Sequence, residues 1–153
     1  MEKTLVILKP SAIQREMVGE VISRFERKGL QLCGIKMIWL SDELASQHYA
    51  HLADRPFFQR VKDAMTISPV IATCWQGLDA INVVRSMSGT TNGRDAQPGT
   101  IRGDFSVSVQ ENIVHTSDSA ENAKIELERF FSKDELFDYK KSSFDFLYAN
   151  DEV

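Results

Sequence analysis

His115 is the residue of this chain with the clearest capacity for chemistry. It lies in the stretch NIVHTSDS, between a short apolar run and polar residues that favour the start of a helix. An imidazole can act as a base, a nucleophile or a metal ligand, and a nucleophile needs a second group that holds one ring nitrogen. Glu126 is the candidate for that group, because it lies about two turns into the following helix if Asp118 caps it. Taken alone, a structural histidine at the end of a strand is the more common interpretation.

A second set of residues could bind an anion. Lys9 ends a run of apolar residues, where a charged side chain requires a partner. Arg85 precedes a glycine-rich segment, residues 88–104, which contains Thr91 and ends near Arg102. The backbone N–H groups of such a segment, flanked by guanidinium groups, can bind phosphates. Arginines held in structural ion pairs explain the same pattern equally well.

Motifs for other chemistries are missing or weak. The sequence contains no P-loop and no dinucleotide-binding glycine motif after a strand. His48 and His51 have helical spacing but lack the further ligands of a zinc pattern, so we predict two surface residues of a helix. Cys33 and Cys74 lie far apart in apolar surroundings, which favours two buried free thiols in a reducing compartment.

The composition is that of a soluble globular protein. Of the 153 residues, 42% are hydrophobic and 26% are charged, and a single domain over residues 1–153 is the simplest organisation. The net charge of −4 gives no reason to expect a nucleic-acid partner. The N-terminus lacks the architecture of a signal peptide, and no apolar stretch is long enough to span a bilayer. We therefore expect a cytoplasmic protein without a membrane partner.

Hydrophobic periodicity predicts alternating strands and helices. Apolar runs predict strands at residues 4–8, 31–40, 69–75 and 113–115. Helical spacing predicts helices from Val18 to a C-cap at Gly29, from a cap at Ser41-Asp42 through Leu52, around 57–65, at 78–87, and from Asp118 onward. This order predicts an α+β fold, a ferredoxin-like βαββαβ sandwich with a four-stranded, mostly antiparallel sheet and helices on one face.

Three segments stand outside this plan. Residues 88–104 are predicted to form a long loop, and loops of this length are usually functional. Residues 105–110 alternate like a strand, although the plan has no place for a fifth strand. The tail from Ser132 onward keeps many aromatic residues, so we expect an extended C-terminal tail that packs on the rest of the chain.

Five motifs occur in one order over nearly the whole chain: KTLVILKP, DRPFF, MSGTTN, PGTIRGDF and NIVHTSDS. In this order they resemble the nucleoside diphosphate kinase family. The resemblance implies ping-pong phosphoryl transfer, in which a nucleoside triphosphate, chiefly ATP, phosphorylates a histidine and a second nucleoside diphosphate collects the phosphoryl group. It also implies Mg²⁺ carried mainly by the nucleotide phosphates, and a homo-oligomer, with a hexamer favoured over a tetramer.

The resemblance assigns roles to individual positions. It implies that His115 is the nucleophile that becomes phosphohistidine, that Glu126 orients it and that Ser117 is bonded nearby. Phe57 corresponds to the residue that stacks on the base, and Val61 and Val109 line the same slot. The positions that correspond to phosphate and ribose contacts, some of them also catalytic, are Lys9, Tyr49, Arg85, Thr91, Arg102 and Asn112.

Three positions depart from the family pattern. Ser11 replaces an aspartate and is expected to cap a helix in its place; Gly93 replaces a proline and is expected to loosen its loop. Thr116 replaces a glycine, and this β-branched residue would be strained if the position required a positive φ. A catalytically silent relative that senses nucleotides or binds partners is the alternative to an active enzyme. Such a relative is expected to lose the histidine or a charged contact, and here none is lost.

Overall fold

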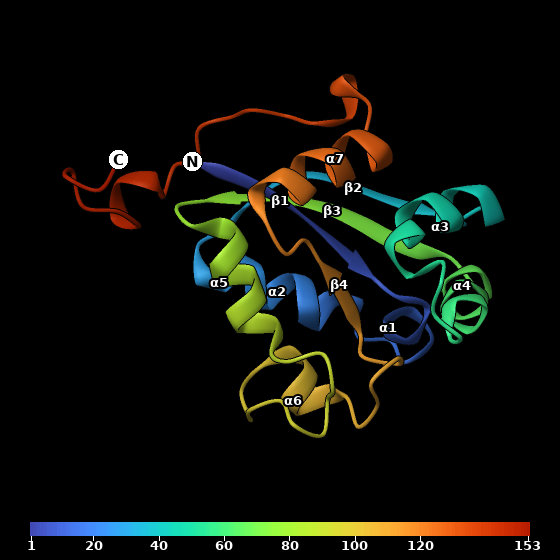
Figure 1. Cartoon of the computed structure of the whole chain (residues 1–153). Helices are drawn as coiled ribbons and strands as arrows, with labels where there is room; N and C mark the ends of the chain where they lie inside the picture. Colours follow the sequence, from blue (N-terminus) through green and yellow to red (C-terminus); the bar gives the residue numbers. More distant parts are fainter.

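A four-stranded antiparallel sheet forms the centre of the computed structural model, which describes all of residues 1–153 (Figure 1). The strands are β1 (Glu2–Leu8), β2 (Gln31–Ile38), β3 (Val70–Gly77) and β4 (Val114–Thr116), and their order across the sheet is β2-β3-β1-β4. The α+β class and the predicted ferredoxin-like arrangement are confirmed, and all four predicted strands are present within a few residues of their expected limits.

Both faces of the sheet are covered, so the prediction of helices on one face alone was wrong. Successive residues of a strand point to opposite faces, and β1 is apolar at every position from Leu5 to Leu8. Leu5 and Ile7 belong to one hydrophobic cluster, whereas Val6 and Leu8 belong to another. An uninterrupted apolar run is the expected signature of a strand buried on both faces.

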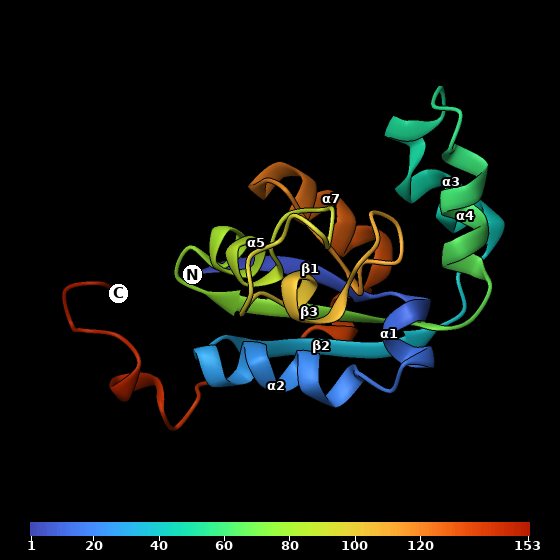
Figure 2. The same ribbon diagram turned by 90° about the horizontal axis from the view of Figure 1, so that it is seen from below.

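One face packs against α2 (Val18–Lys28) and α5 (Ala80–Ser88). The rings of Phe25 and Trp75 lie 5.3 Å apart in this layer. The other face packs against α7 (Ala120–Phe130) and the helix pair α3 (Asp42–His48) and α4 (Phe58–Thr66). In Figures 1 and 2 this pair lies at the opposite end of the molecule from the two chain termini.

Capping residues set the helix ends. Gly29 ends α2 with a φ of 101°, and Ser41 begins α3 by accepting a hydrogen bond from Leu44 N, both as predicted. The last long helix begins one residue later than predicted, because Ser119 and not Asp118 is its N-cap. The short helix α1 (Pro10–Gln14) follows Lys9 as its N-cap. The expected capping role of Ser11 is wrong, since its hydroxyl has no hydrogen-bond partner.

The glycine-rich segment is more ordered than predicted. Its end forms a short helix, α6 (Ile101–Phe105), and the residues that follow do not form a strand. Instead the Ser106 hydroxyl donates to backbone carbonyls of Ser108 and Glu111, which bends the chain locally. Gly93 N donates to the Ser108 carbonyl at 3.0 Å and lies so close to Ser106 that a side chain would clash with it. Gly93 therefore fixes this segment where loosening was expected.

The C-terminal tail runs along the first half of β2. Phe137 N donates to the Cys33 carbonyl at 2.8 Å, and the Tyr139 hydroxyl donates to the Leu32 carbonyl at 2.9 Å. Farther on, Phe146 is 90% exposed, so the end of the tail does not bury all its aromatic side chains. Three 3₁₀ turns complete the chain: η1 (Ala50–Leu52), η2 (Lys133–Glu135) and η3 (Phe144–Phe146). Both cysteines are buried and free, as predicted.

Candidate active site

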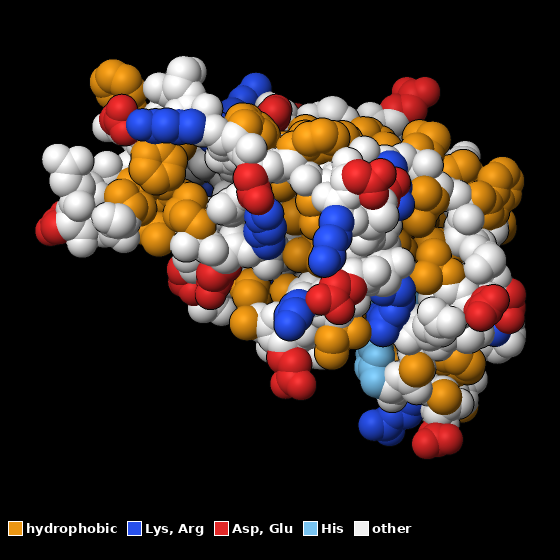
Figure 3. All heavy atoms as spheres, turned by 90° about the horizontal axis from the view of Figure 1, so that it is seen from above, with side chains coloured by type: hydrophobic (Ala, Val, Ile, Leu, Met, Phe, Trp, Pro, Cys, Tyr) orange, Lys and Arg blue, Asp and Glu red, His pale blue; other side chains and the backbone are white.

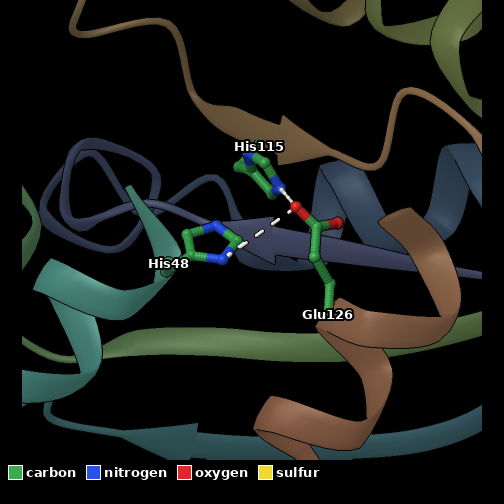
Figure 4. A group of neighbouring side chains, drawn as sticks. All are labelled: His48, His115 and Glu126. Carbon is green, nitrogen blue, oxygen red and sulfur yellow. Dashed lines mark hydrogen bonds and ion pairs between the residues drawn. The ribbon is translucent and has the colours of Figure 1, made fainter. Parts of the chain in front are cut away.

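His115 projects from β4 and contacts α7. Its Nε2 atom lies 3.0 Å from Glu126 Oε1, and Nδ1 points away from the carboxylate (Figure 4). Ser117 donates to the other oxygen, Oε2, at 2.5 Å. Burial alone would raise the pKa of Glu126, but the hydrogen bonds from His115 and Ser117 hold it below its ordinary value. An ionised carboxylate accepts the Nε2 proton, so the Nδ1 lone pair is free.

A strained turn places His115. Val114 N donates to the Asn112 carbonyl at 2.8 Å across Ile113, which has a φ of 74° and is fully buried. This γ-turn is rare for any residue, and a positive φ costs a β-branched side chain about 1–3 kcal/mol. Thr116 carries no such strain, because it pairs with Val6 in the sheet and its φ is not positive. The strain that the sequence suggested at Thr116 is therefore found before the histidine, at Ile113.

A polar cavity of about 570 Å³ opens in front of His115. The phosphate-contact positions implied by the resemblance all line it: Lys9, Tyr49, Arg85, Thr91, Arg102 and Asn112. Three of these side chains are cationic, and Asp118 is the one carboxylate among the lining residues. A hydrogen bond from Asn122 lowers the pKa of Asp118. The cavity therefore suits an anion and offers no cage of carboxylates to a hard cation.

Lys9 is fixed at the floor of this cavity. Its Nζ donates to Asn112 Oδ1 at 2.6 Å and to the Gln110 carbonyl at 3.2 Å. Asn112 in turn donates to the carbonyls of Thr91 and Val109, both at 2.8 Å. Burial, together with the charge of Arg102, lowers the pKa of Lys9 to about 8. Lys9 is thus a pre-positioned cation that is charged at neutral pH and loses its charge as the pH rises through about 8.

Arg102 joins the glycine-rich segment to the histidine strand. Its guanidinium donates to the carbonyls of Gly89, Asn112 and Val114 at 2.8, 3.3 and 2.7 Å. Burial and the neighbouring charge of Arg85 lower the pKa of Arg102 to about 10. The side chain therefore supplies positive charge to the cavity and also holds its walls together.

A second, apolar cavity of about 490 Å³ adjoins the polar one. Phe57, Val61 and Val109 line it, as the resemblance implied for the base slot. The two cavities share Lys9 and Tyr49 among other lining residues, so they lie side by side. Phe57 and Val109 are 37% and 51% exposed, which leaves a ring face and an alkyl group available to a planar ligand. Together the cavities fit a molecule with a flat apolar end and an anionic end.

Two residues near the site were not predicted from the sequence. His48 was predicted on the surface, which is wrong: it is only 3% exposed, and its ring centroid lies 4.4 Å from that of His115. Its position between Leu44 and Leu52 at helical spacing was the signal that could have placed it inside. Arg60, one turn after Phe57, was also missed, and its Nε donates to Gln110 Oε1 at 2.9 Å beside the apolar cavity.

The comparison with known proteins decides the family. A family model described as nucleoside diphosphate kinase matches residues 2–136. The chain belongs to the nucleoside diphosphate kinase family. A nucleoside diphosphate kinase of Parabacteroides distasonis is 66% identical over 152 residues, covering 99% of both chains, and one of Archaeoglobus fulgidus is 47% identical over 97% of this chain and 98% of its own.

Solved structures agree with this assignment. The kinase matches a halophilic nucleoside diphosphate kinase from Halobacterium salinarum in complex with CDP, with a TM-score of 0.95, 39% identity and coverage of 97% of this chain and 99% of the other. A family protein from Babesia bovis matches with a TM-score of 0.93 and 38% identity over 97% and 100% of the two chains. The kinase is a phosphotransferase that binds nucleotides, and enzymes of this family need a divalent cation. None of its helices is both long and apolar enough to cross a membrane.

Proposed function

We propose that this kinase transfers the γ-phosphoryl group of a nucleoside triphosphate, chiefly ATP, to nucleoside diphosphates through phosphohistidine at His115, and so maintains the nucleotide pools for nucleic-acid synthesis. The observation that carries the proposal is the hydrogen bond between His115 Nε2 and Glu126, which leaves Nδ1 free beside a cationic cavity. In the first half-reaction Nδ1 attacks the γ-phosphorus, the bond to the β–γ bridging oxygen breaks, and the nucleoside diphosphate leaves with that electron pair.

Glu126 keeps its negative charge throughout this step. It stabilises the positive charge that develops on the imidazole and keeps the proton on Nε2, while Ser117 fixes the second carboxylate oxygen. In the second half-reaction a β-phosphate oxygen of another nucleoside diphosphate attacks the same phosphorus and the bond to Nδ1 breaks. Because neither half-reaction consumes a proton at Nε2, the enzyme returns to its starting state.

Positioning and charge neutralisation account for the rest of catalysis. The negative charge that spreads over the phosphoryl group in the transition state is neutralised by three cations, Lys9, Arg85 and Arg102. The phosphate and ribose are contacted by Tyr49, Thr91 and Asn112. We propose Mg²⁺ as the divalent cation. The cavity offers it only Asp118, so the nucleotide phosphates would hold most of its coordination sphere, where it neutralises phosphate charge.

The base is proposed to stack on Phe57, with Val61 and Val109 as the other walls of the slot. Every base has a π-face, so stacking binds purines and pyrimidines alike, and we expect the kinase to accept both. The halophilic relative was solved with CDP, a pyrimidine nucleotide, which is consistent with such a slot.

We further propose a single domain over residues 1–153, a cytoplasmic location and a homo-oligomer, with a hexamer favoured over a tetramer. A nucleic-acid partner is not expected, because acidic and basic side chains are interspersed over the face drawn in Figure 3 and the net charge is −4. The alternative of a catalytically silent relative receives no support, since none of the site residues implied by the resemblance is missing.

Labelling tests the proposal. The protein is incubated with γ-labelled ATP and Mg²⁺, the bound label is checked for acid lability, and GDP or CDP is then added. The expected result is a protein-bound, acid-labile phosphoryl group that passes to either acceptor, and no labelling of His115→Gln. Equal labelling of wild type and His115→Gln would contradict the mechanism.

A further inference from the structure

A third cavity, of about 300 Å³, lies behind His115 on the side of Glu126. Its lining includes His48 from α3 and Arg129 from α7, neither of which belongs to the phosphate or base contacts described above. Arg129 follows Glu126 by three positions and so projects from the same face of α7. One Nη atom of Arg129 lies 3.2 Å from His48 Nδ1.

This contact determines where the proton of His48 resides. A guanidinium group has only donors and is not deprotonated in proteins, so His48 Nδ1 must accept and its proton must lie on Nε2. His48 Nε2 is buried and has no hydrogen-bond partner, and Glu126 Oε1 lies 3.9 Å from Nδ1, too far to accept a hydrogen bond from it. Arg129 is therefore the one group that fixes His48 as the Nε2–H form.

The tautomer matters because both histidines face the same carboxylate oxygen. His48 Nδ1 lies 3.9 Å from Glu126 Oε1, which already accepts from His115 Nε2 at 3.0 Å (Figure 4). With a proton on Nδ1, His48 would need only a small ring movement to donate to Oε1. It would then compete with His115 for the group that orients the nucleophile.

We propose that Arg129 and His48 are a positioning pair for the reaction: Arg129 holds His48 without a proton on Nδ1, and so reserves Glu126 Oε1 for His115. The buried His48 ring, packed edge-on at 4.4 Å from the His115 ring, also limits rotation of the nucleophile. The kinetic part rests on the proposed function, because it assumes that His115 reacts. The tautomer of His48 does not depend on it.

Charge on His48 is not the variable that Arg129 controls. Burial lowers the pKa of His48 to about 3; His115, Arg129 and His51 act in the same direction, and Glu126 opposes them. The aromatic rings of Tyr49 and Phe130 complete its surroundings and carry no charge at neutral pH. His48 is therefore neutral over the working range, and only the position of its single proton is open to change.

Long-range ¹H–¹⁵N spectra of the labelled protein distinguish the two tautomers directly. Wild type is expected to show His48 as the Nε2–H form, and Arg129→Met is expected to move it toward the Nδ1–H form. Arg129→Lys keeps a donor at this place and is expected to restore the Nε2–H form. A wild-type His48 protonated on Nδ1, or an unchanged tautomer in Arg129→Met, would overturn the proposal whether or not the protein transfers phosphoryl groups.

Single-turnover phosphorylation by ATP gives the functional readout. Arg129→Met is expected to slow phosphoryl transfer about fivefold, the cost of weakening one orienting hydrogen bond, without changing the nucleotide Kd. Lys124→Met, an exposed change on the same helix, is the matched control and is expected to have no effect. In a His48→Phe background nothing competes for Glu126, so Arg129→Met should then cost nothing more. An equal cost in both backgrounds would show a merely structural role for Arg129 and overturn the pairing.

Discussion

The chemistry of His115 depends on which of its ring nitrogens is occupied. His115 Nε2 is hydrogen-bonded to Glu126 Oε1 at 3.0 Å, and the strained turn at Ile113 fixes the strand from which the ring projects. The sequence indicated the histidine, its motif and the pairing with Glu126. It could not indicate the turn, because isoleucine rarely adopts a positive φ and nothing in the sequence marks Ile113 as an exception. Helical spacing with Leu44 and Leu52 could have placed His48 on the buried face of its helix, but it could not show that this face lies beside His115.

Replacing Thr116 tests whether the residue after the histidine affects turnover. The residue lies in extended backbone paired with Val6, so replacing it by glycine relieves no strain. We predict that Thr116→Gly changes turnover by less than tenfold, which corresponds to ~1.4 kcal/mol in the barrier. Steady-state kinetics of the purified variant measure this. A gain well above tenfold would mean that threonine distorts the site after all.

Lys9 gives the enzyme a pH dependence on the alkaline side. Its pKa is lowered to about 8, so the amine is charged below that pH and loses its charge as the pH rises through it. Because kcat/KM reports groups of the free enzyme, we predict that kcat/KM for the nucleotide falls above about pH 8. Bound phosphate favours the charged amine, so kcat should hold to higher pH.

Profiles of kcat/KM and kcat between neutral and strongly alkaline pH measure this effect. Lys3→Ala serves as the control, since Lys3 lies near the start of β1, the strand that ends just before Lys9, and pairs with Asp138. Its profile should match that of wild type. A kcat/KM that stays constant well above pH 8 would show that nucleotide binding and transfer do not require a charged Lys9.

At the scale of elements, the site lies where separate segments meet at one end of β1 and β4. The strand order and helix positions follow from apolar periodicity, and so could be predicted. The conformation of residues 88–111 could not be predicted, because it depends on side chains that donate hydrogen bonds to distant backbone carbonyls. Arg102 donates to Gly89 and Val114, and Asn112 donates to Thr91. Such contacts leave no periodic signal in the sequence.

Arg102 should therefore be important for stability as well as for binding. Arg102→Met leaves three backbone carbonyls without their charged donor, and we predict a loss of about 3 kcal/mol in the free energy of unfolding. Arg94→Met removes one exposed contact, to the Val107 carbonyl, and should cost less than about 1 kcal/mol. Denaturant unfolding of both variants provides the comparison. Equal stability of the two would contradict the structural role of Arg102.

At the scale of the molecule, edge strand β2 is only partly covered. The tail bonds to its first half, whereas Ile35, Met37 and Trp39 are 49%, 60% and 64% exposed in its second half and just beyond. Apolar residues exposed along an edge strand favour association with another chain. This exposed apolar surface supports the proposed homo-oligomer. The sequence placed the three residues on one face of a strand but did not show that they are exposed.

A charge on this face should therefore weaken assembly. We predict that Met37→Lys lowers the native mass measured by light scattering, while the far-ultraviolet circular dichroism remains that of wild type. Phe146→Lys, a change at the 90% exposed tail residue, should keep the native mass. If Met37→Lys assembles like wild type, the contacts between chains lie elsewhere.

The central claim, phosphoryl transfer through His115, is tested most directly by identifying the atom that carries the phosphoryl group. After reaction with ATP and Mg²⁺ and no acceptor, ¹⁵N–³¹P spectra of the labelled protein identify the phosphorylated nitrogen. Because Glu126 holds Nε2, we predict phosphate on Nδ1 of His115 alone. Phosphate on Nε2, or on any other residue, would contradict it.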